Sequence, residues 1–282
     1  MIRCMVRFGA LSYHMVGFPS VHNKNLLRIH NVYNTDDPTD SKNKGTGTMA
    51  AKDRKTALLD HLKQAILTTV LRPGHDLDEV ALCAEFGLSR TPVREVFRDL
   101  DGLGYLDLRD NRGPRVSELS HTTLRDFFLA APMIYGAILR LAARNATPAQ
   151  IEALKGAQEA FRGALRDKGP AERALANNRF HEITGEMAGN TYLLPSFQRL
   201  LIDHARIGMT FYQPQTNEMA ANLSEASAQH DAIIAAIETG DEGRAATLAE
   251  DHWNLSRHQI ELFVMPTALD VPMGSFSRSS PA

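Results

Sequence analysis

Residues 86–100, FGLSRTPVREVFRDL, constrain the fold of this 282-residue chain most strongly, because they combine the end of one helix with the start of another. Gly87 can adopt the left-handed conformation that ends a helix. Thr91 is a good N-cap residue, and Pro92 suits the first helical position, where its missing N–H costs nothing. The apolar residues that follow recur at helical spacing and predict a buried stripe of Val93, Val96, Phe97 and Leu100. The segment therefore predicts two helices joined by a tight turn.

Basic side chains gather at the start of the second of these helices, away from its apolar stripe. Arg90 and Arg94 accompany Ser89, Thr91 and Pro92 at the N-terminal end, where the helix dipole is already positive. Cations are unfavourable there in an isolated helix. They become favourable when an anion lies opposite, such as a phosphate or the edge of a guanine. We therefore expect these five residues to form a DNA-contacting tip.

The neighbouring segments predict a winged helix–turn–helix. A helix running from residue 55 ends before the breaker at 72–74, and a short helix starts near Asp78. After the central segment, residues 105–108 alternate as a strand does, and residues 114–116 begin a return strand after a turn. A helix, a helix–turn–helix and a two-stranded hairpin in this order form that fold.

A small helical domain without a DNA role would also explain the helices. The hairpin tip favours DNA, since it adds Arg112, Gly113 and Arg115 as further candidate contacts. Two separated basic points suit a helix in the major groove and a wing near the minor groove.

The rest of the chain predicts an all-α antiparallel bundle. Residues from 120 onward are rich in Ala and Leu and poor in strand signals, and Pro, Gly and Asn breaks divide them into six helices. The expected helices are 121–145, 148–168, 170–188, 191–211, 217–239 and 241–264. Such a bundle is large enough to enclose its own core and an internal cavity.

Charge and composition restrict which half of the chain can face DNA and in which cellular compartment the protein can work. Residues 117–282 carry 14 Lys and Arg against 19 acidic residues, so this half would face away from DNA. Two cysteines are too few for a disulfide framework and fit a reducing cytoplasm. No apolar run reaches the roughly 20 residues of a membrane helix, so we expect no membrane partner. Residues 1–48 show no sustained period and indicate a poorly ordered extension, or an upstream start codon with Met49 as the working one.

Three histidines of the predicted bundle could hold a metal. His230 and His252 flank the turn at Gly240 at similar distances, so an antiparallel hairpin would place them at similar height. His181 lies on the third helix, and Asn177 lies one turn before it on the same face. Three imidazoles and one side-chain oxygen can bind a divalent transition metal with positions left open. Each histidine taken singly is better explained as a hydrogen-bonded core or surface residue, the interpretation we keep for His121, His204 and His258.

With both halves in view, the chain resembles the GntR family of bacterial transcription regulators, FadR subgroup, with an FCD ligand-binding domain. The motifs that carry the resemblance are LRPGHDLDE at 71–79, FGLSRTPVRE at 86–95, RLAARNATPAQIEAL at 140–154, FHEITGEMAGN at 180–190 and QHDAIIAAIETGD at 229–241. The family commonly holds a metal, which here could be Zn, Ni or Mn, with an Asp and three His. The matching positions are Asn177, His181, His230 and His252, with Asn in place of Asp.

A second departure concerns the effector. The family often has an Arg and a Glu on the first bundle helix, where this chain has Ala131 and Tyr135. If that Arg grips an effector carboxylate, this protein must use another residue. Arg206 is the candidate, Tyr135 is a second candidate effector contact, and a solvent-facing role for Arg206 is the alternative.

The resemblance implies a homodimeric regulator, not an enzyme, that binds a palindromic DNA operator as a repressor and responds to a small organic acid. One alternative is a regulator whose effector is the metal itself, and a less favoured one is a metal-dependent hydrolase. The expected domains are an extension at 1–50, a winged helix–turn–helix at 51–118, a helical effector-binding and dimerisation domain at 119–265, and a disordered tail at 266–282.

Overall fold

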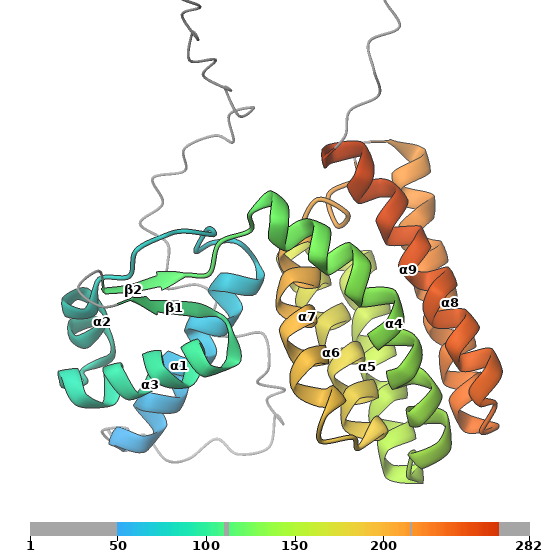
Figure 1. Ribbon diagram of the computed structural model, residues 1–282, viewed down its shortest axis with the longest axis horizontal. Coiled ribbons are helices and arrows are strands. Elements are labelled where there is room, and N and C mark those ends of the chain that lie inside the picture. The colour runs from blue at the N-terminus through green and yellow to red at the C-terminus, as the bar shows by residue number, and fades with distance from the viewer. Residues whose placement is uncertain (1–49, 110–112, 215, 265–282) are drawn as a thin grey trace, which may run out of the picture. The chain divides into compact units, whose positions relative to one another are not determined.

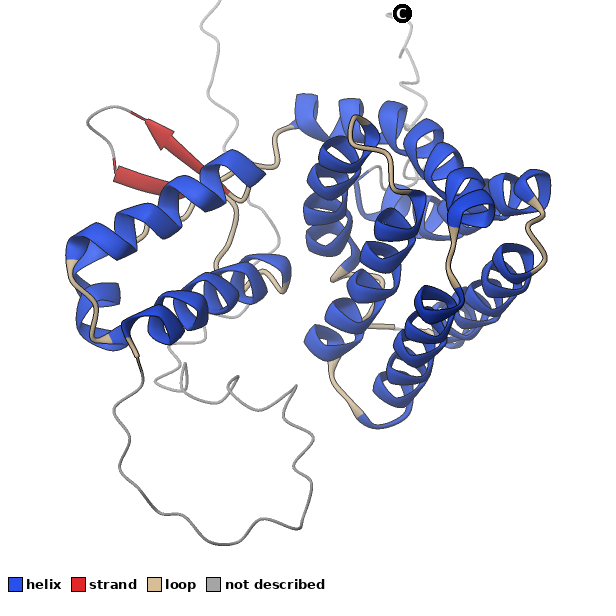
Figure 2. Cartoon of the chain, turned by 90° about the horizontal axis from the view of Figure 1, so that it is seen from below, coloured by secondary structure: helices blue, strands red, loops and turns tan. Residues whose placement is uncertain are grey.

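The computed structural model describes residues 50–109, 113–214 and 216–264, all within one compact unit, Thr46–Ala282. The expectations for the extension at 1–50 and for the tail at 266–282 therefore lie outside the described residues, apart from residue 50. Among the described residues, strands occur only in a single hairpin, and helices make up nearly all other regular structure (Figure 1, Figure 2). The mainly α fold that the sequence predicts is confirmed.

The N-terminal part of the described chain is a winged helix–turn–helix, called the head below. Its elements are α1 (Ala51–Leu67), α2 (Glu79–Phe86), α3 (Arg90–Leu103), β1 (Leu106–Arg109) and β2 (Gly113–Val116). The two strands pair antiparallel, with Leu106 opposite Val116. Apolar side chains of α1, α3 and both strands pack into one core, whose centre comprises Leu58, Leu62, Val93, Phe97, Leu100, Leu106 and Val116.

Local residues explain where α2 begins and ends. The Asp78 carboxylate accepts hydrogen bonds from the backbone N–H groups of Val80 and Ala81, which have no partner inside the helix. Gly87 ends α2 in the left-handed conformation, at φ 60°. Both features agree with the sequence.

The start of α3 differs from the prediction. The helix begins at Arg90, and Ser89 is its N-cap residue in an extended conformation, so Thr91 is not the cap. Pro92 is the third helical residue instead of the first. It is still tolerated because the N–H groups of the whole first turn lack intrahelical acceptors.

The C-terminal part of the described chain is a bundle of helices, as predicted. Its helices are α4 (His121–Asn145), α5 (Pro148–Asp167), α6 (Pro170–Ala188), α7 (Leu193–Gly208), α8 (Asn217–Glu238) and α9 (Glu242–Val264). Side-chain caps at Ser120, Thr147 and Thr216 start three of them, and proline is the first residue of α5 and α6. Aromatic residues from three helices, including Phe127, Tyr135, Phe197 and Trp253, meet in the bundle core.

The head and the bundle share buried contacts through α6 and α7. Leu175, Ile202 and Ala205 belong to the same apolar cluster as the core of the head. The guanidinium of Arg206 donates to the hydroxyl and the backbone carbonyl of Ser117, just after β2, at 2.9 Å each. Arg206 therefore links α7 to the base of the wing.

Candidate functional site

The exposed end of α3 carries the cationic residues that the sequence predicts. Arg90 and Arg94 project from its first two turns, and one carboxylate at the start of α2 orients both. Glu79 accepts a 2.9 Å hydrogen bond from Nε of Arg94, and its other oxygen lies 3.6 Å from Nε of Arg90. The hydrogen bond and charge of Glu79 raise the pKa of Arg94, so this guanidinium stays ionised. The two arginines thus form a fixed, exposed pair.

The hairpin presents only part of the expected wing. Gly113 is exposed and has a positive φ of 69°, while Arg112 lies outside the described residues. Arg115 makes a bidentate ion pair with Asp76, at 2.6 and 2.9 Å, which lowers the pKa of that carboxyl group. An Arg115 contact to DNA would therefore compete with Asp76.

The three predicted histidines converge inside the bundle. His181 of α6, His230 of α8 and His252 of α9 are buried, and one ring nitrogen of each lies within 4.8 Å of the others. Nε2 of His181 and Nε2 of His230 are buried and have no hydrogen-bond partner. A buried polar atom without a partner costs about 1–3 kcal/mol, and a bound metal would satisfy both atoms. The residues present fit a divalent transition metal.

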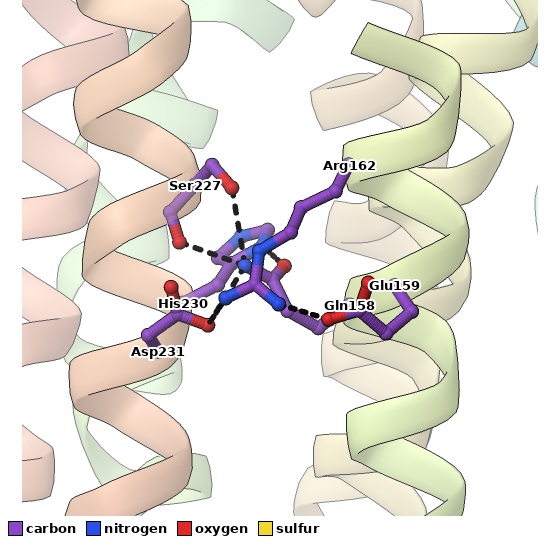
Figure 3. A network of polar contacts seen from close by, with 6 residues as sticks. All are labelled: Gln158, Glu159, Arg162, Ser227, His230 and Asp231. Atoms are coloured by element: carbon purple, nitrogen blue, oxygen red, sulfur yellow. Dashed lines mark hydrogen bonds and ion pairs between the residues drawn. The ribbon is translucent and has the colours of Figure 1, made fainter. Parts of the chain in front are cut away.

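Hydrogen bonds around His230 determine which of its nitrogens can bind a metal (Figure 3). Nε2 of Gln158 donates 2.8 Å to the Ser227 carbonyl, which can only accept, so the amide oxygen of Gln158 faces the histidine. That oxygen lies 3.0 Å from Nδ1 of His230, which must therefore carry the proton. Nε2 of His230 therefore carries the lone pair, which faces the histidine cluster.

The same arrangement holds His252. Nε2 of Gln229 donates to the carboxylate of Glu225, so the amide oxygen of Gln229 accepts from Nδ1 of His252 at 2.9 Å. Amide oxygens thus fix the tautomers of two of the three imidazoles, and each carries its proton on Nδ1. Sequence reasoning missed both glutamines.

Electrostatics keep these imidazoles neutral. Burial, together with a smaller effect of neighbouring histidines, lowers the pKa of His252 to about 3 and the pKa values of His181 and His230 well below the ordinary value. Neutral imidazole is the form that binds metals. The cluster of ligating atoms contains no carboxylate among the described residues.

A fourth histidine, His204 of α7, lies beside the cluster, although it was not selected from the sequence. Its ring centroid lies 5.3 Å from that of His181, and its Nδ1 lies 2.6 Å from the hydroxyl of Tyr135. Burial lowers the pKa of His204 to about 4. Its position four residues after Leu200 and seven after Phe197, both buried, is the helical signal that could have identified it.

A small cavity lies beside the histidines. It has a volume of about 10 Å³ and is lined by Asn177, His204 and His252, together with Gly208, Phe211, Tyr212, Ala226 and Leu255. Asn177 therefore borders the same cavity as His252, and its role as a metal ligand stays a prediction. Arg206 does not line this cavity. It is buried with its donors on Ser117, so the solvent-facing alternative is wrong, and its proposed contact to an effector stays a prediction.

Comparison with known proteins assigns the family. The family described as "Bacterial regulatory proteins, gntR family" matches residues 55–116, and the FCD domain family matches residues 132–255. The "Probable D-xylose utilization operon transcriptional repressor" of Paenarthrobacter nicotinovorans is 31% identical over 168 residues, which cover 60% of this chain and 71% of that protein. The chain belongs to the GntR family.

Two further relatives agree with this GntR assignment. The HTH-type transcriptional repressor RspR of Escherichia coli K12 is 28% identical over 127 residues, or 45% of this chain and 56% of that protein. The solved structure of E. coli McbR/YncC has a TM-score of 0.63 at 18% identity and covers 77% of this chain and 100% of its own, which shows the same fold. The GntR protein described here is a DNA-binding transcriptional regulator with an FCD domain, and its relatives are named as regulators, not as enzymes.

Proposed function

We propose that this GntR protein is a cytoplasmic homodimer of the FadR subgroup that represses transcription from a palindromic operator and is released by a small organic acid bound near a metal. The fixed Arg90 and Arg94 pair at the exposed start of α3 is the observation that carries the DNA-binding part. In this proposal residues 51–118 bind DNA, residues 119–265 bind the effector and form the dimer, and Arg112, Gly113 and Arg115 touch the backbone near the minor groove.

The donor set favours a metal with affinity for nitrogen. Three neutral imidazoles would hold the ion, with Asn177 as a neutral oxygen neighbour, so Zn or Ni suits the site better than Mn, which prefers carboxylates. A bound divalent cation would supply open coordination positions and positive charge to an anionic ligand. Because Asn177 replaces an acid, that charge is not compensated by the protein, and an organic anion would compensate it.

The small volume of the cavity limits which molecules can bind without a change in structure. About 10 Å³ is room for one water molecule at most, so a metabolite requires the helices around His204 and His252 to separate. The effector must then bind the opened arrangement better than the closed one, since equal affinity would shift nothing. We assign Tyr135 and His204, which share a hydrogen bond, as the side chains that meet the effector.

The small cavity also favours a second candidate function, in which the metal itself is the effector. Binding of the purified protein to a labelled operator, obtained by selection from random duplexes at moderate ionic strength, separates the two. Operator binding that follows added Zn²⁺ or Ni²⁺ after chelation, without any organic ligand, would assign the metal as effector. Absence of both sequence preference and salt-sensitive binding would remove the regulator proposal altogether.

Gln158 offers a separate test of the metal centre. We expect Gln158→Leu to weaken Zn²⁺ binding by about 10–100-fold, because His230 loses the acceptor that fixes its tautomer. Competition with a chromophoric chelator measures the affinity. Ser227→Ala is the matched control, since it removes a 3.1 Å contact to Gln158 but keeps the acceptor on His230. Equal affinities of the two variants would contradict the role of Gln158.

A further inference from the structure

A larger cavity lies between the head and the bundle, and we call it the joint cavity. Its volume is about 200 Å³. An apolar cavity of roughly 150 Å³ can hold benzene, so the joint cavity has room for a molecule somewhat larger than a benzene ring. Lys63 of α1, Leu103 of α3 and Tyr105 line it from the head, and residues of α6 and α7 line it from the bundle. It shares no lining residue with the small cavity beside His204 and His252.

Two nearly buried polar side chains of the joint cavity have hydrogen-bonding groups without a partner. Tyr105 is 9% exposed, and Asn178 of α6 is 6% exposed. Among the described residues, the Tyr105 hydroxyl makes no hydrogen bond. The Asn178 amide nitrogen donates to Glu182 at 2.8 Å, and the amide oxygen accepts from none of the described residues. Burial raises the pKa of Tyr105, so its hydroxyl keeps its proton and can donate. Nearly buried groups of this kind favour a polar ligand that satisfies them.

Opposite charges lie on the two sides of the joint cavity. On the head side, the half-buried Lys63 makes no ion pair among the described residues, and its Nζ lies 5.9 Å from the centroid of the Tyr105 ring. On the bundle side lie Glu182 and Glu186. Arg179, outside the cavity lining, donates to both carboxylates, at 3.2 and 2.8 Å. The two cations and two carboxylates cancel, so a ligand that matches both sides carries one charge of each sign.

We propose that the joint cavity binds a free α-amino acid with an apolar side chain. Its carboxylate would meet the Lys63 ammonium and the Tyr105 hydroxyl. Its ammonium would meet the amide oxygen of Asn178 and the Glu186 carboxylate, of which only one oxygen has a partner among the described residues. A ligand with a single charge would leave the groups on one side of the cavity unpaired, whereas a zwitterion pairs both.

Apolar residues line the rest of the joint cavity and favour an apolar side chain on the ligand. Leu103 lies on the head side, and Leu194, Phe197 and Leu201 of α7 lie on the bundle side. Removal of apolar ligand surface from water against these residues would stabilise the complex. Because head and bundle each supply part of the lining, the ligand would favour the arrangement in which the two meet here. This site is separate from the effector site proposed above.

Isothermal titration calorimetry on the full chain without DNA tests the proposal with matched probes. L-Leucine and L-phenylalanine should each bind at one site per chain. Isocaproate lacks only the ammonium of leucine, and isoamylamine lacks only its carboxylate. Each should bind at least about tenfold more weakly than L-leucine, because each leaves one side of the cavity without its partner.

Variants assign the binding to the joint cavity. Tyr105→Phe keeps the buried ring and removes the hydroxyl, and Lys63→Met removes the ammonium. Each should weaken L-leucine binding by roughly tenfold, since a hydrogen bond to a charged group is lost. Lys52→Met is the matched control, because it removes the same charge from an exposed position of α1 outside the cavity. It should bind L-leucine like wild type. Circular dichroism and Zn²⁺ binding report whether each variant is folded.

Three results would overturn the proposal. One is the absence of binding of both amino acids at millimolar concentrations. Another is L-leucine binding that Lys63→Met and Tyr105→Phe leave at wild-type strength, because the ligand would then bind elsewhere. The third is isocaproate binding as tight as that of L-leucine and lost in Lys63→Met, which would assign the joint cavity to a simple carboxylate.

Discussion

Replacing His181 by alanine should abolish tight binding of Zn²⁺. In the proposed metal site His181 supplies one of three imidazole ligands, and its Nε2 is buried without a hydrogen-bond partner. Loss of a ligand should cost more than the 10–100-fold typical of a lost supporting hydrogen bond. Titration against a chromophoric chelator measures the affinity directly.

A stability measurement gives the same prediction an independent readout. A metal at about 100 times its dissociation constant stabilises the native state by about 2.7 kcal/mol, which raises the melting temperature of a chain this size by about 5–10 °C. The His181→Ala variant should melt at the same temperature with and without Zn²⁺. His121→Ala, which removes an exposed imidazole at the start of α4, should keep the full increment. A zinc-dependent rise in His181→Ala equal to that of wild type would rule out the site.

Replacing Arg94 by alanine should weaken operator binding by about 1–3 kcal/mol, or roughly 5–150-fold, if its guanidinium makes a bidentate contact to a guanine. Glu79 engages Nε of Arg94, whereas a bidentate contact uses the two terminal amino groups. Glu79 therefore orients the side chain without blocking it. Fluorescence anisotropy on a labelled operator at fixed salt gives the affinity.

The control for this experiment is Arg166→Ala, which removes the same charge from an exposed position on α5. It should bind the operator like wild type. A base contact also predicts that Arg94→Ala loses discrimination at one position of each half-site, whereas a phosphate contact predicts uniform loss across sequences. Wild-type affinity in Arg94→Ala would contradict the assignment of α3 as the recognition helix.

The helices were predictable because the residues that break them act locally. Pro148 and Pro170 each begin a helix, and Gly87 ends one, as their backbone preferences require. The prediction was less accurate where two cap residues compete. Ser89 and Thr91 are both good N-caps, and α3 uses the earlier one, so Pro92 falls two residues further into the helix than expected.

The histidine site was partly predictable for a similar reason. His230 and His252 face each other across one turn, and this proximity follows from counting residues. The residues that support them could not be found in this way, since Gln158 lies 72 positions from His230, and Tyr135 lies 69 positions from His204. Such pairs arise from helix packing, which local sequence patterns do not encode.

The close spacing of functions on α7 has a mechanical consequence. His204 borders the cavity. Arg206, two residues later, donates hydrogen bonds to Ser117, directly after β2. Two residues of helix advance about 3 Å along the axis, so no long relay is needed between ligand and operator. In the proposed dimer, an effector that displaces His204 would therefore also displace Arg206 and its hydrogen bonds to Ser117, and the angle between the two recognition helices would change with it.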